Sequence, residues 1–178
     1  MELWDIYNIN REKTGRTMVR GQRMKEGDYR IMVHACIFNS QGQMLIQQRQ
    51  SSKKDWPGMW DVSACGSAVS GDTSGRAVAR ELEEELGIKL PLENTPPHLT
   101  VNFHGIFDDI YLIEKDVDIS SLSLQYEEVK DVKWADIDEI FKLIDDGAFI
   151  PYHKSLITLF FDMRSTYGTV NRKKQKIG

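Results

Sequence analysis

The chain contains 178 residues, of which 40% are hydrophobic and 28% are charged, and its formal net charge is −4. This length and composition predict one globular domain with a sizeable core, because a second full domain would need more residues. The negative charge argues against duplex nucleic acid and anionic membranes as partners, since both attract clustered cations. An anionic small-molecule substrate would therefore need a metal ion or local cations.

The apolar runs are too short to form a transmembrane helix. The run "IMVHACIF", residues 31–38, is far below the ~20 apolar residues that cross a bilayer. The N-terminus "MELWDIYNIN" is acidic and polar, whereas a secretory signal begins basic and continues apolar. We therefore expect a cytoplasmic protein. Its two cysteines, Cys36 and Cys65, are too few for a disulfide framework or a zinc site, and we expect buried thiols.

The first third of the chain predicts three strands. The segment "LWDIYNI", residues 3–9, could form the first strand and could pair across a homodimer. The polar segment "REKTGRTMVRGQRMKEGDY", residues 11–29, is expected to run over the surface. The runs "RIMVHACIF" and "MLIQQR" then read as two strands, because Asn39, Ser40 and Gly42 between them favour a hairpin turn.

The middle of the chain predicts a loop, a strand and the clearest helix. The segment "WPGMWDVSACG", residues 56–66, reads as a loop that leads into a strand. Residues 73–86 have helical periodicity and stop at Gly87, which suits a left-handed position after a helix, with Ile88 as the apolar contact. Asp72 is a suitable N-cap residue for this helix, and Thr73 is the competing choice.

The last third predicts three strands and two helices. Residues 99–114 read as two strands around Gly105, and residues 128–135 as one more. The segments "DIDEIFKLIDDG" and "HKSLITLFFDMRSTYG" have helical spacing, each closed by a glycine. Strands that are mostly joined by hairpins, together with a few helices, predict an α+β sandwich. We expect one domain over residues 1–170, followed by a basic tail, "NRKKQKIG", over residues 171–178.

The helix at 73–86 crowds carboxylates onto one face. Glu81, Glu84 and Glu85 are related as i, i+3 and i+4 and lie next to an arc that includes Val78, Leu82 and Leu86. Like charges at this spacing cost roughly 0.2–0.5 kcal/mol per pair, and more where water is partly excluded. Arg80 can neutralise only part of the cluster. Mg²⁺ or Mn²⁺ would neutralise it, since hard divalent cations prefer carboxylate oxygens.

The segment from Gly66 to Ile88 resembles the Nudix box. The match consists of a glycine, the spacing to the helix, and the run Arg-Glu-apolar-x-Glu-Glu-x-Gly-apolar at residues 80–88. The first glutamate of the box is replaced by Asp72, a departure that we expect to tune the site without abolishing it. The resemblance implies an α/β/α sandwich in which a mixed sheet lies between the box helix and the C-terminal helices.

The resemblance also implies an activity, the metal-dependent hydrolysis of a diphosphate linkage in a nucleoside-diphosphate-like or related organic pyrophosphate. The expected cofactor is Mg²⁺ or Mn²⁺. By resemblance, Glu81 and Glu85 are metal ligands together with the carbonyl of Gly66, and Glu84 binds a second metal or helps to position the water. Arg80 would orient the glutamates through charge-assisted hydrogen bonds. Glu83 points away from this face and is expected to be solvated.

Outside the box, the sequence offers several candidates for a general base or a substrate contact. We take Glu128 as the catalytic candidate, and Arg49, at the end of a strand, as the phosphate contact; a surface ion pair is the competing role for Arg49. The other candidates for the base are Glu127, Asp108 and Asp109. Trp56 and Trp60 could stack on a base or could anchor their loop.

Two alternatives remain open from the sequence. Residues 37–66 also resemble isopentenyl diphosphate isomerases, in which a catalytic cysteine stands at the position of Cys65. However, Ser67 and Arg30 stand where the isomerase resemblance places metal-binding histidines, and "FDDI", residues 107–110, lacks the expected glutamate. The second alternative is a non-catalytic Nudix domain that senses a nucleotide, which loss of the glutamate cluster would have favoured.

Overall fold

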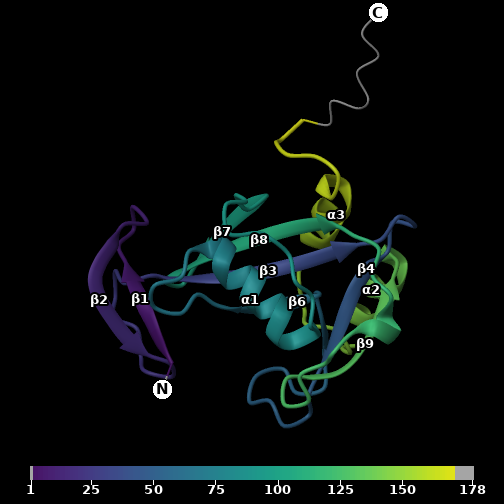
Figure 1. Cartoon of the computed structure of the whole chain (residues 1–178), viewed down its shortest axis with the longest axis horizontal. Coiled ribbons are helices and arrows are strands. Elements are labelled where there is room, and N and C mark those ends of the chain that lie inside the picture. The colour runs from purple at the N-terminus through teal and green to yellow at the C-terminus, as the bar shows by residue number, and fades with distance from the viewer. Residues whose placement is uncertain (1, 171–178) are drawn as a thin grey trace, which may run out of the picture.

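The computed structural model describes residues 2–170, which form a mixed seven-stranded sheet with helices on both faces and a separate two-stranded hairpin (Figure 1). The strands are β1 (Leu3–Tyr7), β2 (Lys13–Val19), β3 (Arg30–Phe38), β4 (Met44–Arg49), β5 (Trp60–Asp61), β6 (Ala64–Ser67), β7 (Leu99–Phe103), β8 (Ile106–Glu114) and β9 (Val129–Ala135). The helices are α1 (Ser74–Leu86), α2 (Ile137–Asp145), α3 (Lys154–Met163) and a short 3₁₀ turn, η1 (Ile119–Ser121).

Strand β3 is the axis of the sheet. On one side it runs parallel to β8, with Val33 opposite Asp109, and on the other side it pairs antiparallel with β6 and with the start of β4. The remaining pairs, β7 with β8, β9 with β4 and β5 with β4, are antiparallel. The strand order β5-β4-β3-β8-β7 therefore makes a mixed sheet, as predicted.

Side chains of β3 alternate between two apolar clusters, one on each face of the sheet. Ile31, Val33, Ala35 and Ile37 pack with the apolar face of α1. Residues 36 and 38 instead pack with buried side chains from α2 and α3. The box helix and the C-terminal helices thus cover opposite faces (Figure 1), and the predicted α/β/α sandwich is confirmed.

Helix α1 begins and ends close to the predicted positions. The Thr73 side chain accepts a hydrogen bond from the backbone N–H of Arg76, so Thr73 and not Asp72 is the N-cap. Gly87 adopts the left-handed conformation at φ 72°; its N–H donates to the carbonyl of Glu83, and the N–H of Ile88 donates to that of Leu82. Asp72 is left available to pair with Arg80.

The N-terminal hairpin adds an element that the sequence did not predict, because residues 13–19, expected only to run over the surface, form strand β2 there. Strand β1 pairs with it from Leu3 opposite Val19 to Tyr7 opposite Lys13. Most of β2 is exposed, so its sequence carries no alternation of apolar and polar residues to reveal a strand. Strand β1 thus pairs with β2 of its own chain, and its pairing across a homodimer remains an untested prediction.

Two further expectations concern the C-terminal tail and membrane-spanning helices. The predicted basic tail, residues 171–178, lies outside the described residues. Within residues 2–170, none of the helices has the length and apolar character needed to cross a bilayer.

Candidate active site

The carboxylate of Glu81 lies directly over the backbone of Gly66. A Cβ atom built on Gly66 would meet the Glu81 Cδ and Oε1 atoms at 2.1 Å, so no side chain fits at this position while Glu81 keeps its place. Strand β6 ends one residue later, and the loop of residues 68–73 leads into α1, which returns Glu81 to the strand. The box glycine and the first helix glutamate are therefore adjacent, as the resemblance implies.

Glu85 lies one turn further along α1 and is buried, with 6% of its surface exposed. Its Oε2 atom accepts a hydrogen bond of 2.9 Å from Nε2 of Gln47, on β4. The other amide atom, Gln47 Oε1, is buried and has no hydrogen-bond partner within the described residues. A buried oxygen without a partner is costly, so the pair indicates a site that something else completes. The sequence analysis did not identify Gln47, since nothing in "MLIQQR" distinguishes it from its neighbours.

Burial opposes the ionisation of both carboxylates. It raises the pKa of Glu81 to about 7, although the Arg80 charge opposes this shift and Glu84 adds to it. Burial, followed by repulsion from Glu81, raises the pKa of Glu85 to about 8. The local positive charge is therefore too small to keep both groups ionised at neutral pH.

Arg80 is the basic residue that contacts the carboxylates of the box. Its Nη1 atom lies 2.9 Å from Glu81 Oε1 and 3.0 Å from Glu84 Oε2, and its Nε lies 3.3 Å from Asp72. Its Nη2 donates to the carbonyl of Ser67 at 3.0 Å. Asp72, in place of the box's usual glutamate, thus still reaches the arginine. Arg80 has the orienting contacts that the resemblance implies.

These residues suit a hard divalent cation by their chemistry, although they do not yet converge on one point. All the donors are oxygens, the lack of a side chain at Gly66 lets the Glu81 carboxylate approach the backbone, and Gln47 Oε1 lacks a partner among residues 2–170. In the same part of the chain, no three side chains of His, Cys, Asp or Glu are grouped as they would be around an ion. Glu84 is half-exposed and turned to Arg80, so it would have to leave this ion pair in order to bind a metal.

Glu128, the candidate general base, is held at the margin of this region. It forms an ion pair with Lys53, and the carbonyl of Glu128 accepts a 2.8 Å hydrogen bond from the N–H of Gln50. Its charge contributes to the raised pKa of Glu85, so the two carboxylates are within electrostatic range. Glu127 is exposed. Among the candidates for the base, Glu128 therefore keeps the better position.

The other two candidates for the base are engaged elsewhere. Asp108 accepts a hydrogen bond of 2.6 Å from His34 Nδ1, and His34 Nε2 lies 3.1 Å from the hydroxyl of Tyr152. Asp109 is fully buried and pairs with Arg11 from the N-terminal hairpin. His34 is thus a structural histidine, and both aspartates have buried partners away from the carboxylates of α1.

Cys65 and Arg49 join the same buried network. The Tyr152 hydroxyl donates to Asp61 Oδ1 at 2.9 Å, and the Cys65 thiol lies 3.5 Å from Asp61 Oδ2. Burial raises the pKa of Cys65 well above its ordinary value, which keeps it a thiol and argues against a nucleophilic role. Arg49 lies 3.7 Å from Asp61 and donates to the carbonyl of Asp55. Its guanidinium therefore anchors the loop, and a phosphate contact remains a prediction.

Arg30 and Ser67, the positions at which isomerases would carry histidines, lie in contact. Arg30 Nη1 donates to Ser67 Oγ at 2.6 Å, and the ring of Trp4 packs against the guanidinium, with its centroid 4.5 Å from Cζ. A guanidinium cannot ligate a cation. The metal site expected of an isomerase is therefore not formed by these two residues.

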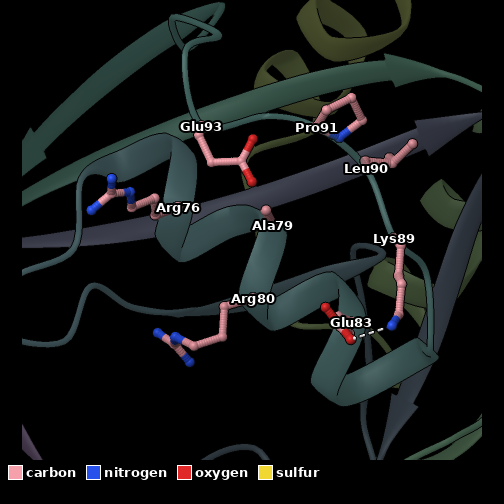
Figure 2. A pocket seen from close by; sticks show the side chains of 8 residues that line it. All are labelled: Arg76, Ala79, Arg80, Glu83, Lys89, Leu90, Pro91 and Glu93. Atoms are coloured by element: carbon pink, nitrogen blue, oxygen red, sulfur yellow. Dashed lines mark ion pairs between the residues drawn. The ribbon is translucent and has the colours of Figure 1, made fainter.

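A groove lies on the outer side of α1, away from Glu81 and Glu85. It has a volume of about 450 Å³ and is lined by Arg76, Ala79, Arg80, Glu83, Lys89, Leu90, Pro91 and Glu93. Figure 2 shows the Glu83–Lys89 ion pair at one end of the groove. Glu81 and Glu85 do not line it, so we do not assign the chemistry to this groove. Glu83 faces solvent, as predicted.

The two tryptophans of the loop before β6 differ in exposure. Trp56 is 48% exposed with φ 51°, whereas Trp60 is half-buried in β5, under the ammonium of Lys133. The loop-anchoring role fits Trp60. Base stacking remains open for Trp56.

Comparison with known proteins gives consistent results. The family model described as the NUDIX domain matches residues 28–157. An uncharacterized Nudix hydrolase of Listeria monocytogenes is 47% identical over 152 residues, which cover 85% of this chain and 90% of the relative. An isopentenyl-diphosphate Delta-isomerase of Escherichia coli is 32% identical over 123 residues, covering 65% of this chain and 68% of that protein.

The fold is also similar to solved structures. The crystal structure of DR0079 from Deinococcus radiodurans superposes with a TM-score of 0.72 at 24% identity, covering 89% of this chain and 97% of that one. A MutT protein from Methanosarcina mazei superposes with a TM-score of 0.59 at 22% identity. At these identities the similarity shows the fold.

Proposed function

This chain belongs to the NUDIX family as a Nudix-type pyrophosphohydrolase, and on that premise we propose that it hydrolyses a small-molecule diphosphate with Mg²⁺ or Mn²⁺. The substrate class is a nucleoside-diphosphate-like compound or a related organic pyrophosphate. One observation carries the proposal: the Glu81 carboxylate lies over Gly66, Glu85 is buried one turn further along α1, and there is too little positive charge to ionise both.

Hydrolysis of a diphosphate requires that the negative phosphates be neutralised and that a water be oriented and deprotonated. A bound Mg²⁺ or Mn²⁺ supplies the neutralising charge and acidifies a water. Glu81, Glu85 and the Gly66 carbonyl would hold the ion, and Glu84 would bind a second ion or help to position the water. Arg80 orients Glu81 and Glu84 through the hydrogen bonds described above.

Glu128 would accept the proton from the attacking water. Its ion pair with Lys53 holds the carboxylate close to the loop of residues 50–59. Arg49 would contact a phosphate only after giving up its hydrogen bonds to the Asp55 carbonyl, so we assign it a smaller effect than Glu128.

The test incubates the purified protein with Mg²⁺ or Mn²⁺ and a panel of nucleotide sugars, dinucleotides, nucleoside triphosphates, coenzyme A and isopentenyl diphosphate. We expect phosphate-containing products from at least one diphosphate, loss of this activity with a chelator, and its return on adding metal. Migration of a double bond without hydrolysis would support the isomerase instead. Nucleotide binding without any turnover would favour the sensing domain.

A further inference from the structure

We propose that Arg30 binds a phosphate oxygen of the substrate, and that Ser67 and Trp4 hold its guanidinium in place for this purpose. The inference rests on the proposed hydrolysis of a diphosphate and assigns an anion-binding residue outside the box. Arg30 begins β3 and Ser67 ends β6, so the contact joins two neighbouring strands beside Gly66.

The position of Ser67 links Arg30 to the candidate metal site. The Ser67 hydroxyl accepts from Arg30 at 2.6 Å, while the Ser67 carbonyl accepts from Arg80 at 3.0 Å. Arg80 in turn contacts Glu81, whose carboxylate lies over Gly66. Glu2 is within electrostatic range of both Arg30 and Glu81, so a diphosphate held beside Glu81 could extend towards Arg30. Arg30 would then bind the phosphate farther from the carboxylates.

The two arginines at Ser67 differ in how their charge is compensated. Arg80 has three carboxylates within salt-bridge distance. Arg30 is only partly exposed, and within residues 2–170 its contacts are the Ser67 hydroxyl and the face of Trp4, with no carboxylate in salt-bridge range. A covered charge without a counter-ion is costly. This imbalance favours an anionic ligand, which would supply the missing charge.

Neighbouring charges compensate Arg30 only in part. Burial lowers the pKa of Arg30 and the Arg20 charge lowers it further, whereas the charges of Asp108 and Glu2 oppose this shift. A guanidinium nevertheless stays protonated in proteins. Two positive charges therefore lie close together, of which Arg20 is paired with Glu2. A phosphate would relieve this repulsion, and the planar guanidinium can bind two of its oxygens at once.

The N-terminal hairpin fixes the geometry of Arg30. Trp4 is 9% exposed, and its indole N–H donates to Glu2 at 2.7 Å. The hairpin itself is joined to the loop before α1, where the N–H of Ser70 donates to the Leu3 carbonyl at 2.7 Å. The guanidinium is thus held between a packed aromatic ring and a hydroxyl, which reduces the entropy lost when it binds a ligand.

A purely structural role for Arg30 would be to clamp the hairpin through Trp4, and the two roles predict different results. The test compares wild type with Arg30→Met, which keeps the aliphatic stem, and Arg30→Lys, which keeps the charge. For the best substrate of the panel, with Mg²⁺, we expect Arg30→Met to raise KM by about tenfold to a hundredfold and to change kcat by less than about threefold. The Kd of methylenediphosphonate, a non-hydrolysable diphosphate, should rise by a similar factor. Arg30→Lys should give an intermediate loss.

The controls separate binding from folding. Arg76→Gln removes an exposed arginine on the outer side of α1 and should leave KM within about twofold, because its charge is screened by water. The melting temperature without ligand should stay within a few degrees in Arg30→Met. If that variant does not fold, Ser67→Ala replaces it, since loss of the hydroxyl that holds the guanidinium should still weaken methylenediphosphonate binding several-fold.

The outcomes also distinguish this inference from the proposed function. An unchanged Kd for methylenediphosphonate in folded Arg30→Met, or in Ser67→Ala, would overturn the role of Arg30 even if metal-dependent hydrolysis is observed. Absence of hydrolysis across the panel would overturn the proposed function, while methylenediphosphonate binding would still test Arg30.

Discussion

Each face of the central sheet buries ionisable side chains, and the two sets differ in how well their polar atoms are satisfied. On the α1 face, Glu81 and Glu85 repel each other beside the Gln47 oxygen, which has no partner within the described chain. On the opposite face, His34 and Asp108 begin a continuous set of contacts that runs through residues 152, 61 and 65.

This difference separates a binding site from a structural network. A buried polar network whose members have partners stabilises one arrangement of the core. A buried group without a partner lowers stability and persists where function requires it, for example where a ligand completes it. We therefore place the chemistry on the α1 face, although the opposite face holds a histidine, a cysteine and two aspartates.

The largest expected effect follows from removing a charge on the α1 face. Glu85→Gln keeps the volume and the contact with Gln47 but removes a metal ligand, so turnover should fall by about a hundredfold or more. Steady-state hydrolysis of the best substrate measures this fall, and circular dichroism checks the fold. A near wild-type rate in a folded variant would show that Glu85 does not hold the metal.

The second effect concerns the pH dependence of stability without metal. The pKa of Glu85 is about 8 and that of Glu81 about 7 in the folded protein, against 4.5 in the unfolded chain. Between pH 4.5 and 8 the folded state binds more protons, so its free energy of unfolding falls as pH rises. Thermal melts with a chelator should show this fall, and it should be smaller in Glu85→Gln. Adding Mg²⁺ or Mn²⁺ at pH 8 should restore wild-type stability more than that of the variant. Equal pH dependence in both proteins would contradict the prediction.

The third effect tests the opposite face. Tyr152→Phe removes the hydroxyl that contacts His34 and Asp61 and leaves buried polar atoms without this partner. The cost should be about 1–3 kcal/mol, or roughly 3–10 °C in melting temperature, with kcat within about twofold of wild type. Tyr167→Phe, at an exposed tyrosine, is the matched control and should melt like wild type. A large loss of kcat in a stable Tyr152→Phe would place this network in the chemistry.

The smallest effect is expected at Glu83. Its ion pair with Lys89 is exposed on both sides, so Glu83→Gln should change stability by less than about 0.5 kcal/mol and leave turnover unchanged. Because Glu83 is two residues from Glu85, the two variants compare the inner and outer faces of one helix. A large loss of turnover here would mean that the outer face also carries function.

Much of the fold could be predicted from the sequence, because many of its helices and strands have characteristic patterns of neighbouring residues. The apolar run of β3 with the turn residues after it, and the spacing of α1, predicted a strand and a helix, and the glycine at residue 87 marked the end of that helix. Strand β2 was not predicted, since a strand exposed on both faces has no apolar alternation to detect. The N-cap was uncertain between Asp72 and Thr73 because either residue type can accept the hydrogen bond.

The residues of the candidate site also fall into two groups, those that the sequence identifies and those that only the structure identifies. Glu81, Glu85 and Arg80 could be chosen from the sequence, since their spacing on one helix fixes which of them share a face. Gln47 could not be chosen, because its importance depends on a contact with a helix 38 residues away. Likewise, Asp108 and Asp109 are poor candidates for the general base because His34 contacts the first and Arg11 the second. These contacts exist only in the folded chain.

By itself, the sequence determined the box, the order of most strands and helices, and the acidic face of α1, because these depend on the spacing of residues along one segment. The tertiary structure alone decided which carboxylates are buried, which have partners, and that the partly covered Arg30 has no carboxylate within salt-bridge distance among residues 2–170. Burial and charge compensation depend on residues far apart in the chain, such as Arg30 and Ser67, and no local pattern encodes their contact.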